Sequence, residues 1–235
     1  MKEIGSYSLG MTTHTSQNNM EIYFVRHGET YYNRKGLHQD LDVPLSDLGR
    51  TQIELAGDVL KKSGATKLIT SDLTRAYQSA EIISAKTGLT PELSVLFREV
   101  KRPSELYGKR YISTETLKAG VSILLHLQNK DWHYSDEENL YDLKARVARA
   151  VDYLIEAGKE HEKVIVVSHA FIINIFIKYM CAHKGVRVRD YLRTLVAAKR
   201  LGNASISTVV FNDDRNDLTC DWLCTKVNDR SHLGA

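Results

Sequence analysis

The chain has 235 residues, of which 43% are hydrophobic and 26% are charged, and its formal net charge is +3. These values are typical of a globular protein, and the charge is too small for the dense basic stripe that nucleic-acid-binding domains usually carry. We therefore expect one globular domain over residues 21–235 and no nucleic-acid partner. Residues 1–20 are rich in polar side chains and are expected to form a disordered N-terminal tail.

Two features of the sequence indicate the cellular compartment. Residues 1–20 lack the apolar core of a secretory signal, and three cysteines are not the even set of a disulfide framework. We expect a cytoplasmic protein in which Cys181, Cys220 and Cys224 stay reduced, the last two as small apolar residues of a late strand. Polar residues interrupt the apolar run 164–180, which predicts a buried strand and helix and no membrane span.

The first half of the chain alternates short β-branched or aromatic runs with segments of helical periodicity. Ser46 starts one predicted helix, and Gly88 ends another that Ser71 or Asp72 could cap. The predicted strands are 21–25 and 67–70, and the predicted helices are 48–62 and 73–87.

The second half continues this alternation. Ser135 is predicted to cap a long amphipathic helix whose first turn holds the acidic residues 136–138. The other predicted elements are a strand at 93–96, a helix at 113–128, a strand at 163–168, a helix at 171–182, and an antiparallel pair at 205–211 and 218–224. Strands and helices in this order predict an α/β fold, a three-layer αβα sandwich around a mostly parallel sheet.

Polar and charged side chains follow several of the predicted strands. In parallel α/β sheets, ligands bind beyond the carboxyl ends of the strands, where these side chains would meet. The residues are Arg26, His27, Thr30 and Asn33 after the first strand, Ser71, Asp72 and Arg75 after the second, Arg98 and Glu99 after the third, and Ser168 and His169 after strand 163–168. Together they predict an anion-binding pocket with an acid beside it.

The residue types in this pocket indicate phosphoryl chemistry. Arginine presents a planar fork of donors that suits phosphate oxygens, and it stays charged near neutral pH. A histidine among such cations should have a lowered pKa and remain neutral, which makes its imidazole a nucleophile. A second histidine can donate a hydrogen bond to a bound phosphate. The pocket therefore favours transfer of a phosphoryl group to nitrogen.

Three segments, RHGETYYN (26–33), SDLTRAYQSA (71–80) and VVSHA (166–170), resemble the histidine phosphatase superfamily, also called the phosphoglycerate mutase-like family. The resemblance extends from about residue 21 to residue 211. It implies a phosphoglycerate mutase-like fold and a reaction that needs no metal or other cofactor. It also implies a nucleophile at His27, a phosphate clamp of Arg26, Arg75 and His169, further phosphate contacts from Asn33 and Thr30, and a proton donor at Glu99.

Two positions depart from the pattern of the family. Ala170 follows the second histidine where the family commonly has glycine, and it can serve there if its φ is negative. The stretch VKRPSELYGK after Glu99 differs from the frequent Gly-x-Trp-Glu-Gly of the family. Glu105 is therefore an alternative proton donor.

Simpler interpretations exist for several of these residues. His27 and His169 would then be buried structural histidines, and Arg75 a surface cation paired with Asp72 or Glu81. Charge runs are usually solvated surface, but a basic cluster beside the predicted acid could select a substrate with a second anionic group. This cluster comprises Lys101, Arg102, Lys109 and Arg110.

The sequence predicts a phosphomonoester hydrolase of the phosphatase branch that acts on a small phosphorylated metabolite. A phosphoglycerate mutase is the alternative within the same chemistry, and it needs a longer cover that excludes water. The segment between Glu99 and His169 is short and resembles that of the compact phosphatases. A catalytically silent member that binds phosphorylated proteins is a third interpretation. The chain is expected to be a monomer or a homodimer.

Overall fold

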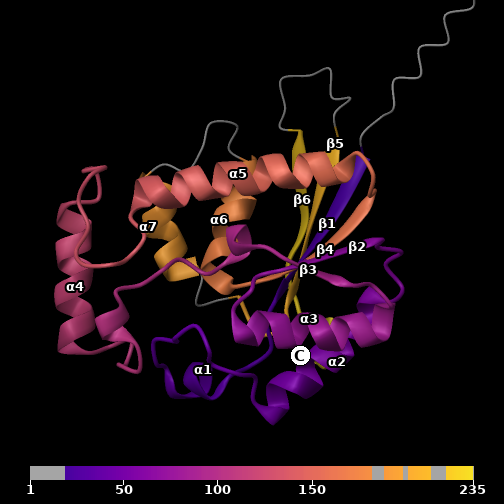
Figure 1. Ribbon diagram of the computed structural model, residues 1–235, viewed down its shortest axis with the longest axis horizontal. Helices are drawn as coiled ribbons and strands as arrows, with labels where there is room; N and C mark the ends of the chain where they lie inside the picture. Colours follow the sequence, from indigo (N-terminus) through magenta and orange to yellow (C-terminus); the bar gives the residue numbers. More distant parts are fainter. Residues whose placement is uncertain (1–18, 182–187, 198–200, 213–220, 235) are drawn as a thin grey trace, which may run out of the picture.

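A six-stranded sheet with the order β3-β2-β4-β1-β5-β6 forms the centre of the molecule (Figure 1). The computed structural model describes residues 19–181, 188–197, 201–212 and 221–234. β3, β2, β4 and β1 are parallel, whereas β5 is antiparallel to β1 and β6 to β5, which confirms the mostly parallel sheet. The strands are β1 (Asn19–Arg26), β2 (Lys67–Thr70), β3 (Pro91–Leu93), β4 (Lys163–Ser168), β5 (Ile206–Asn212) and β6 (Trp222–Asp229).

Helices cover both faces of this sheet, which confirms the predicted three-layer αβα sandwich. Figure 1 shows α5 and α6 on one side of the strands and α2 and α3 on the other. The helices are α1 (Tyr31–Lys35), α2 (Asp47–Leu60), α3 (Thr74–Thr87), α4 (Thr114–Leu125), α5 (Leu140–Gly158), α6 (Ala170–Cys181) and α7 (Val188–Ala197). The short helix α1 and the helix α7 were not predicted from the sequence.

β4 shows how the strand sequences build the two cores. Val164 and Val166 pack in the cluster with α5 and α6, whereas Ile165 and Val167 pack in the cluster with α2 and α3. A parallel strand covered on both faces needs such a continuous apolar run. The register pairs Arg26 at the end of β1 with Ser168 at the end of β4. The residues that follow these two strands therefore begin at the same edge of the sheet.

The long helix α5 begins later than predicted. Ser135 is not its cap, because the Asn139 side chain accepts the backbone N–H of Asp142 at 3.0 Å and the Asp142 carboxylate accepts the backbone N–H of Asn139 at 3.1 Å. This reciprocal pair satisfies two donors at the helix start. The Glu137 carboxylate instead accepts the backbone N–H of Ser135 at 2.8 Å in the preceding turn. Residues 136–138 thus lie before the helix.

The predicted strand 93–96 is displaced from the observed one. β3 covers Pro91–Leu93, and a 3₁₀-helix (η1, Val95–Phe97) follows it. Proline cannot donate to a sheet ladder, but β3 lies at the edge of the sheet, where this donor is not required.

The predicted cap of α3 is also wrong. Neither Ser71 nor Asp72 caps the helix, whose N-cap is Leu73 without a side-chain hydrogen bond. The Asp72 carboxylate pairs with Arg98, and the hydroxyl of Ser71 lies 2.9 Å from Nε2 of His169. Both polar side chains thus contact residues that are distant in the sequence and do not cap the helix. Gly88 ends the helix as predicted, with φ of 76°.

Some predictions concern residues at the limits of the described ranges. The predicted tail lies outside these ranges except for Asn19 and Met20, which begin β1. Cys220 also lies outside them, whereas Cys224 lies in β6. β6 follows β5 as an antiparallel neighbour, as predicted for the last pair, but it extends to Asp229, beyond the predicted end at residue 224. In the part of the chain that the structure describes, no helix combines the length and apolar character needed to cross a bilayer.

Candidate active site

The loop after β1 is pressed against the first turn of α2. A Cβ atom on Gly28 would lie 2.3 Å from the carbonyl oxygen of Gly49, and one on Gly49 would lie 2.1 Å from the carbonyl oxygen of Glu29. Any side chain at either position would separate the loop from the helix. The backbone N–H of Gly28 also donates to the hydroxyl of Ser79 at 3.2 Å. These close contacts explain why glycine follows His27.

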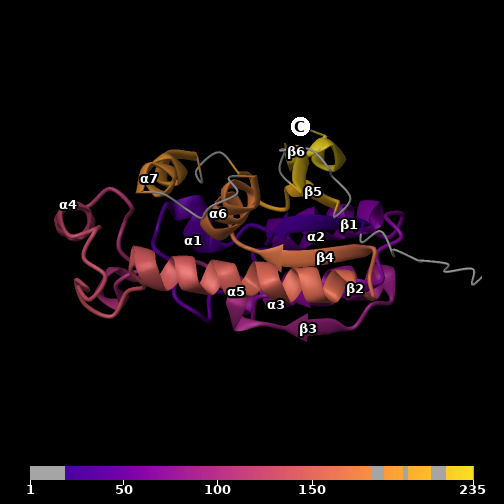
Figure 2. The same cartoon turned by 90° about the horizontal axis from the view of Figure 1, so that it is seen from above.

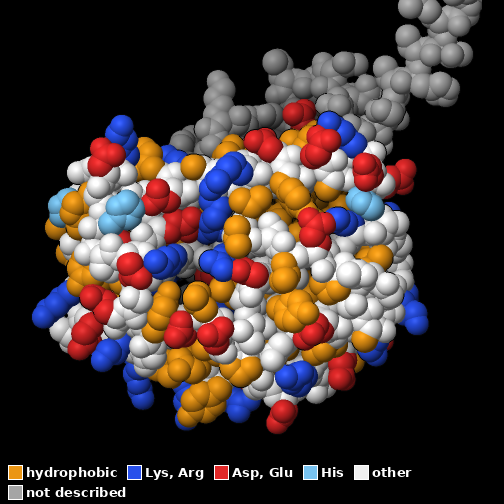
Figure 3. All heavy atoms as spheres, in the orientation of Figure 1, with side chains coloured by type: hydrophobic (Ala, Val, Ile, Leu, Met, Phe, Trp, Pro, Cys, Tyr) orange, Lys and Arg blue, Asp and Glu red, His pale blue; other side chains and the backbone are white. Residues whose placement is uncertain are grey.

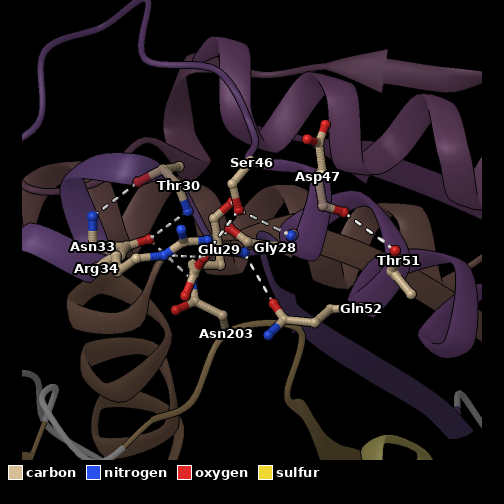
Figure 4. A network of polar contacts seen from close by, with 11 residues as sticks. Gly28, Glu29, Thr30, Asn33, Arg34, Ser46, Asp47, Thr51, Gln52 and Asn203 are labelled. Carbon is tan, nitrogen blue, oxygen red and sulfur yellow. Dashed lines mark hydrogen bonds and ion pairs between the residues drawn. The ribbon is translucent and has the colours of Figure 1, made fainter.

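A polar network fixes the same loop from the other side (Figure 4). Thr30 caps α1: its hydroxyl accepts the backbone N–H of Asn33 at 3.1 Å, and the Asn33 side chain accepts the backbone N–H of Thr30 at 3.3 Å. The side-chain amide of Asn203 donates to Asn33 Oδ1 at 3.1 Å and to the carbonyl oxygens of His27 and Gly28, each at 3.2 Å. Sequence reasoning missed Asn203, which is distant in the chain and resembles an ordinary turn residue.

His27 is buried directly after β1, and its own loop fixes the ring. Nδ1 lies 2.7 Å from the carbonyl oxygen of Gly28. A carbonyl oxygen only accepts hydrogen bonds, so Nδ1 carries the ring proton and Nε2 keeps its lone pair. Burial, with the positive charges of Arg75 and Arg26, holds the pKa of His27 well below its usual value. The imidazole is therefore neutral near pH 7, with Nε2 available as a nucleophile.

His169 follows β4 and lies beside His27. The two ring centroids are 5.1 Å apart. Nε2 of His169 contacts the Ser71 hydroxyl, while Nδ1 is buried and has no hydrogen-bond partner among the described residues. Burial, with the nearby charge of Arg75, holds the pKa of His169 well below its usual value. The site thus contains a second neutral imidazole with one nitrogen unused.

Arg26 and Arg75 reach the site from β1 and α3. Nη1 of Arg75 donates to the carbonyl oxygen of Asp40 at 2.9 Å, and Nη1 of Arg26 donates to that of Leu201. The Nε of each is buried without a partner in the described part of the chain. Burial lowers the pKa of Arg75 to about 10, and the charge of Glu99 opposes this effect. Both guanidinium groups therefore remain positive at neutral pH.

Glu99 lies at the N-terminus of α6. Its carboxylate accepts the backbone N–H groups of Val100 at 3.0 Å and of Phe171 and Ile172, each at 3.1 Å. Helix N-termini attract carboxylates in this way, because their first N–H groups have no partner in the helix. Ala170 begins α6, and its φ lies outside the left-handed region, so the condition for alanine at this position is confirmed.

Glu105, the alternative acid, lies elsewhere. It belongs to the 3₁₀-helix η2 (Ser104–Leu106), is exposed, and forms a hydrogen bond with the side chain of Tyr134. It does not line the cavity, whereas Glu99 does and lies near both arginines. The structure therefore brings Glu99, and not Glu105, to the group of predicted site residues.

A cavity of about 1350 Å³ opens at the carboxyl edge of the parallel strands. Of the seven site residues that the family resemblance implies, five line it, whereas Thr30 and His169 are fully buried and are not part of its wall. The hydroxyl of Thr30 donates to Gln39 at 2.8 Å, so it supports the loop and does not face the cavity. The lining site residues are Arg26, His27, Asn33, Arg75 and Glu99.

The cavity wall also contains several of the other cations. Figure 3 shows Lys and Arg side chains gathered left of centre, where the surface is hollowed. Of the predicted basic cluster, Lys101, Arg102 and Arg110 line the cavity, whereas Lys109 does not. Lys101 pairs with Asp136 at 3.1 Å. The surface interpretation of Arg75 is wrong, because this side chain is buried. Within the described ranges, no three His, Cys, Asp or Glu side chains gather as metal ligands.

Known proteins share this fold and sequence pattern. A protein from Salmonella arizonae described as probable phosphoglycerate mutase GpmB is 28% identical over 218 residues, which cover 92% of this chain and 96% of the relative. The solved mycobacterial glucosyl-3-phosphoglycerate phosphatase in complex with VO3 has a TM-score of 0.72 and 25% identity, with coverage of 89% and 99%. A phosphoglycerate mutase from Bacillus anthracis, at 20% identity and a TM-score of 0.69 with coverage of 93% and 96%, shares the fold.

The family model of the histidine phosphatase superfamily (branch 1) matches residues 22–221, which include every residue of the site described above. The predicted resemblance and the phosphoglycerate mutase-like fold are therefore confirmed. This chain belongs to the histidine phosphatase superfamily.

Proposed function

We propose that the chain hydrolyses phosphomonoesters through a phosphohistidine formed at Nε2 of His27. The observation that carries this proposal is the hydrogen bond from Nδ1 of His27 to the Gly28 carbonyl, which leaves Nε2 unprotonated beside two arginines. Arg26 and Arg75 both line the cavity, so their guanidinium groups can donate to phosphoryl oxygens. Family members described as phosphatases or mutases support phosphoryl-transfer chemistry.

In the first step, Nε2 of His27 attacks phosphorus and the bond from phosphorus to the ester oxygen breaks. Glu99 gives its proton to that oxygen, so that an alcohol leaves and not an alkoxide. Arg26 and Arg75 stabilise the negative charge on the phosphoryl oxygens, as a metal ion would do in other phosphotransferases. His169 lies beside His27, and the charge of the phosphate favours its protonated form.

In the second step, water attacks the phosphorus of phosphohistidine. Glu99, now a carboxylate, takes a proton from the water as the N–P bond breaks, and inorganic phosphate leaves. Asn33 lines the cavity, and its side-chain oxygen accepts a hydrogen bond from Asn203. Its side-chain nitrogen does not take part in that bond and can donate to the transferred group. The protein returns to its starting protonation state.

A small phosphorylated metabolite remains the proposed substrate class. Ligand pockets usually occupy roughly 300–1000 Å³, so a cavity of about 1350 Å³ has room for a leaving group and for water. Ready access of water to phosphohistidine favours hydrolysis, since a mutase must protect this intermediate until the phosphoryl group returns to the sugar acid. The curated relatives described as probable phosphoglycerate mutases keep the mutase as a second candidate.

The nucleophile is tested with wild type and His27→Ala on p-nitrophenyl phosphate in the presence of EDTA. We expect hydrolysis by wild type and a loss of at least about a thousandfold in the variant, since the covalent route is removed. Rapid quenching should trap an acid-labile, alkali-stable phosphoryl group on wild type. Equal rates for the two proteins would exclude the histidine mechanism. Conversion of 3- to 2-phosphoglycerate with little free phosphate would instead identify a mutase.

The proton donor is tested with Glu99→Gln and the matched control Glu105→Gln. Loss of general acid catalysis typically costs about 10²–10⁴-fold. This loss should be largest for alkyl phosphates, whose leaving group needs the proton, and smaller for p-nitrophenyl phosphate. Glu105→Gln should retain the wild-type rate, because Glu105 does not line the cavity. If Glu105→Gln lost activity and Glu99→Gln kept it, Glu105 would be the proton donor.

A further inference from the structure

α4 presents an apolar face to solvent. Of its twelve residues, only Ala119 is buried. Leu117 is 68% exposed, Val121 48%, Leu124 46% and Leu125 78%. Their spacing of four and three residues places them along one side of the helix. Figures 1 and 2 both show α4 at one end of the long axis of the molecule, away from the sheet. Contiguous exposed apolar surface of this kind usually marks a binding site.

The start of α4 is attached to the wall of the cavity. Tyr111 and Ile112 both line the cavity, and Ser113 then caps the helix. The backbone N–H of Tyr111 donates to the carbonyl oxygen of Gly36 at 2.9 Å, which holds the segment against the loop after α1. Ile112 is 89% exposed although it borders the cavity. Ile112 is thus the lining residue nearest in the chain to Ser113, the N-cap of α4, whose exposed apolar residues begin at Leu117.

Apolar side chains also line the cavity. They are Leu41, Leu73, Val100, Tyr107 and Phe171. Two cations of this wall are neutralised by ion pairs, Arg98 with Asp72 and Lys101 with Asp136. The guanidinium of Arg102 lies over the ring of Phe171 at 5.3 Å, and the stem of the arginine adds apolar surface. Lys35 and Arg110 also line the cavity, so the wall offers an apolar group a surface of apolar side chains beside these two cations.

We propose that the preferred substrate is an amphiphilic phosphomonoester. Its phosphoryl group lies at His27, and its alkyl chain passes Tyr111 and Ile112 and continues over Leu117 and Val121 of α4. This proposal rests on the phosphatase function proposed above and names the substrate class of that same site. One ligand then covers both the apolar wall of the cavity and the exposed face of α4. A second copy of the chain would cover only the helix.

The test measures kcat/KM for ethyl, butyl and octyl phosphate, each below the concentration at which it forms micelles. Burial of one methylene group strengthens binding by up to about fourfold. We expect kcat/KM to rise at least about tenfold from butyl to octyl phosphate in wild type, since four additional methylene groups are partly buried. A flat dependence on chain length, with His27-dependent hydrolysis intact, would overturn the amphiphile proposal alone. No His27-dependent hydrolysis of any ester would overturn the phosphatase function and this proposal with it.

Two variants locate the chain-binding surface. Ile112→Ser should lower the ratio of kcat/KM for octyl over ethyl phosphate severalfold, and so should Leu117→Ser. The matched control is Val227→Ser on β6, where the valine is 55% exposed but does not line the cavity. This control should keep the wild-type ratio. An unchanged ratio in Ile112→Ser and Leu117→Ser would overturn the proposal. The proposal would also be overturned if sedimentation showed a dimer that Leu117→Ser dissociates while the ratio of kcat/KM for octyl over ethyl phosphate stays the same. The exposed face of α4 would then bind a second copy of the chain.

Discussion

Replacement of Gly28 by alanine tests whether the contact between the loop and α2 positions His27. The added Cβ would lie 2.3 Å from the carbonyl oxygen of Gly49, whereas ordinary contacts begin at 3.4 Å. The loop must therefore move by about 1 Å, since the opposing atom is backbone and cannot rotate away. Overpacking of this kind costs about 1–3 kcal/mol, and loss of the hydrogen bond to Ser79 adds about 1 kcal/mol. We expect Gly28→Ala to destabilise the protein by about 3 kcal/mol.

Thermal unfolding and kinetics measure the two consequences. For a chain of this length, 3 kcal/mol corresponds to a decrease in Tm of roughly 10 °C. A displacement of 1 Å at the nucleophile should lower kcat/KM by about a hundredfold. Gly120→Ala in α4 is the control, because a Cβ there meets nothing within 4 Å. Alanine in a helix interior should raise stability by about 0.5–1 kcal/mol. If Gly28→Ala kept the wild-type Tm and rate, the close contact would not position His27.

Three further predictions follow from the same geometry. Asn203→Asp replaces a hydrogen-bond donor with an acceptor that faces three oxygens, including those of His27 and Asn33. The free energy of unfolding, measured in urea titrations, should therefore fall by about 2 kcal/mol, and it should fall by less in Asn203→Ala. Arg75→Lys removes the hydrogen bond to the carbonyl oxygen of Asp40 and the planar fork of donors. We expect kcat/KM to fall at least about a hundredfold, whereas Tm should change little. His27 should stay neutral in ¹⁵N NMR spectra at pH 6.5, where an ordinary histidine is half protonated, since burial and the arginines lower its pKa. Titration near pH 6.5 would contradict this. Below about pH 6.5, the unfolded chain binds a proton at His27 and the folded chain does not. The free energy of unfolding is therefore unaffected by His27 above pH 6.5, and it decreases by up to about 1.4 kcal/mol per pH unit as the pH falls from 6.5 toward the lowered pKa.

The sequence allowed most of the sheet and the inner site to be predicted, because both depend on local patterns. The buried run of β4 is continuous and β-branched, so its bounds were predicted correctly. Arg26, His27, Arg75 and Glu99 each follow a strand or begin the next helix, so the parallel topology brings them to one edge. Only the order of strands and helices was required for this inference.

The errors arose where the hydrogen-bond partner of a side chain decides the outcome. Ser135 and Asn139 are both suitable helix caps, and the choice depends on which side chain has a partner. Asn139 has Asp142 three residues later, a spacing that was visible in the sequence, whereas Ser135 is held in a turn by Glu137. Nothing local indicated that Asn203 would bind the His27 loop.

The position of Glu99 shows how the proposed acid is held beside the proposed phosphate site. Ser168 at the end of β4 donates to the carbonyl oxygen of Phe97 at 2.7 Å, and the Glu99 carboxylate accepts two N–H groups from the first turn of α6. The acid is therefore attached to the strand and helix that also carry His169. A shift of α6 would move Glu99 and His169 together relative to His27, so the distance between the proposed proton donor and His169 is kept. This coupling requires α6 to begin immediately after His169, and Ala170, a better helix former than the glycine common in the family, supports that start.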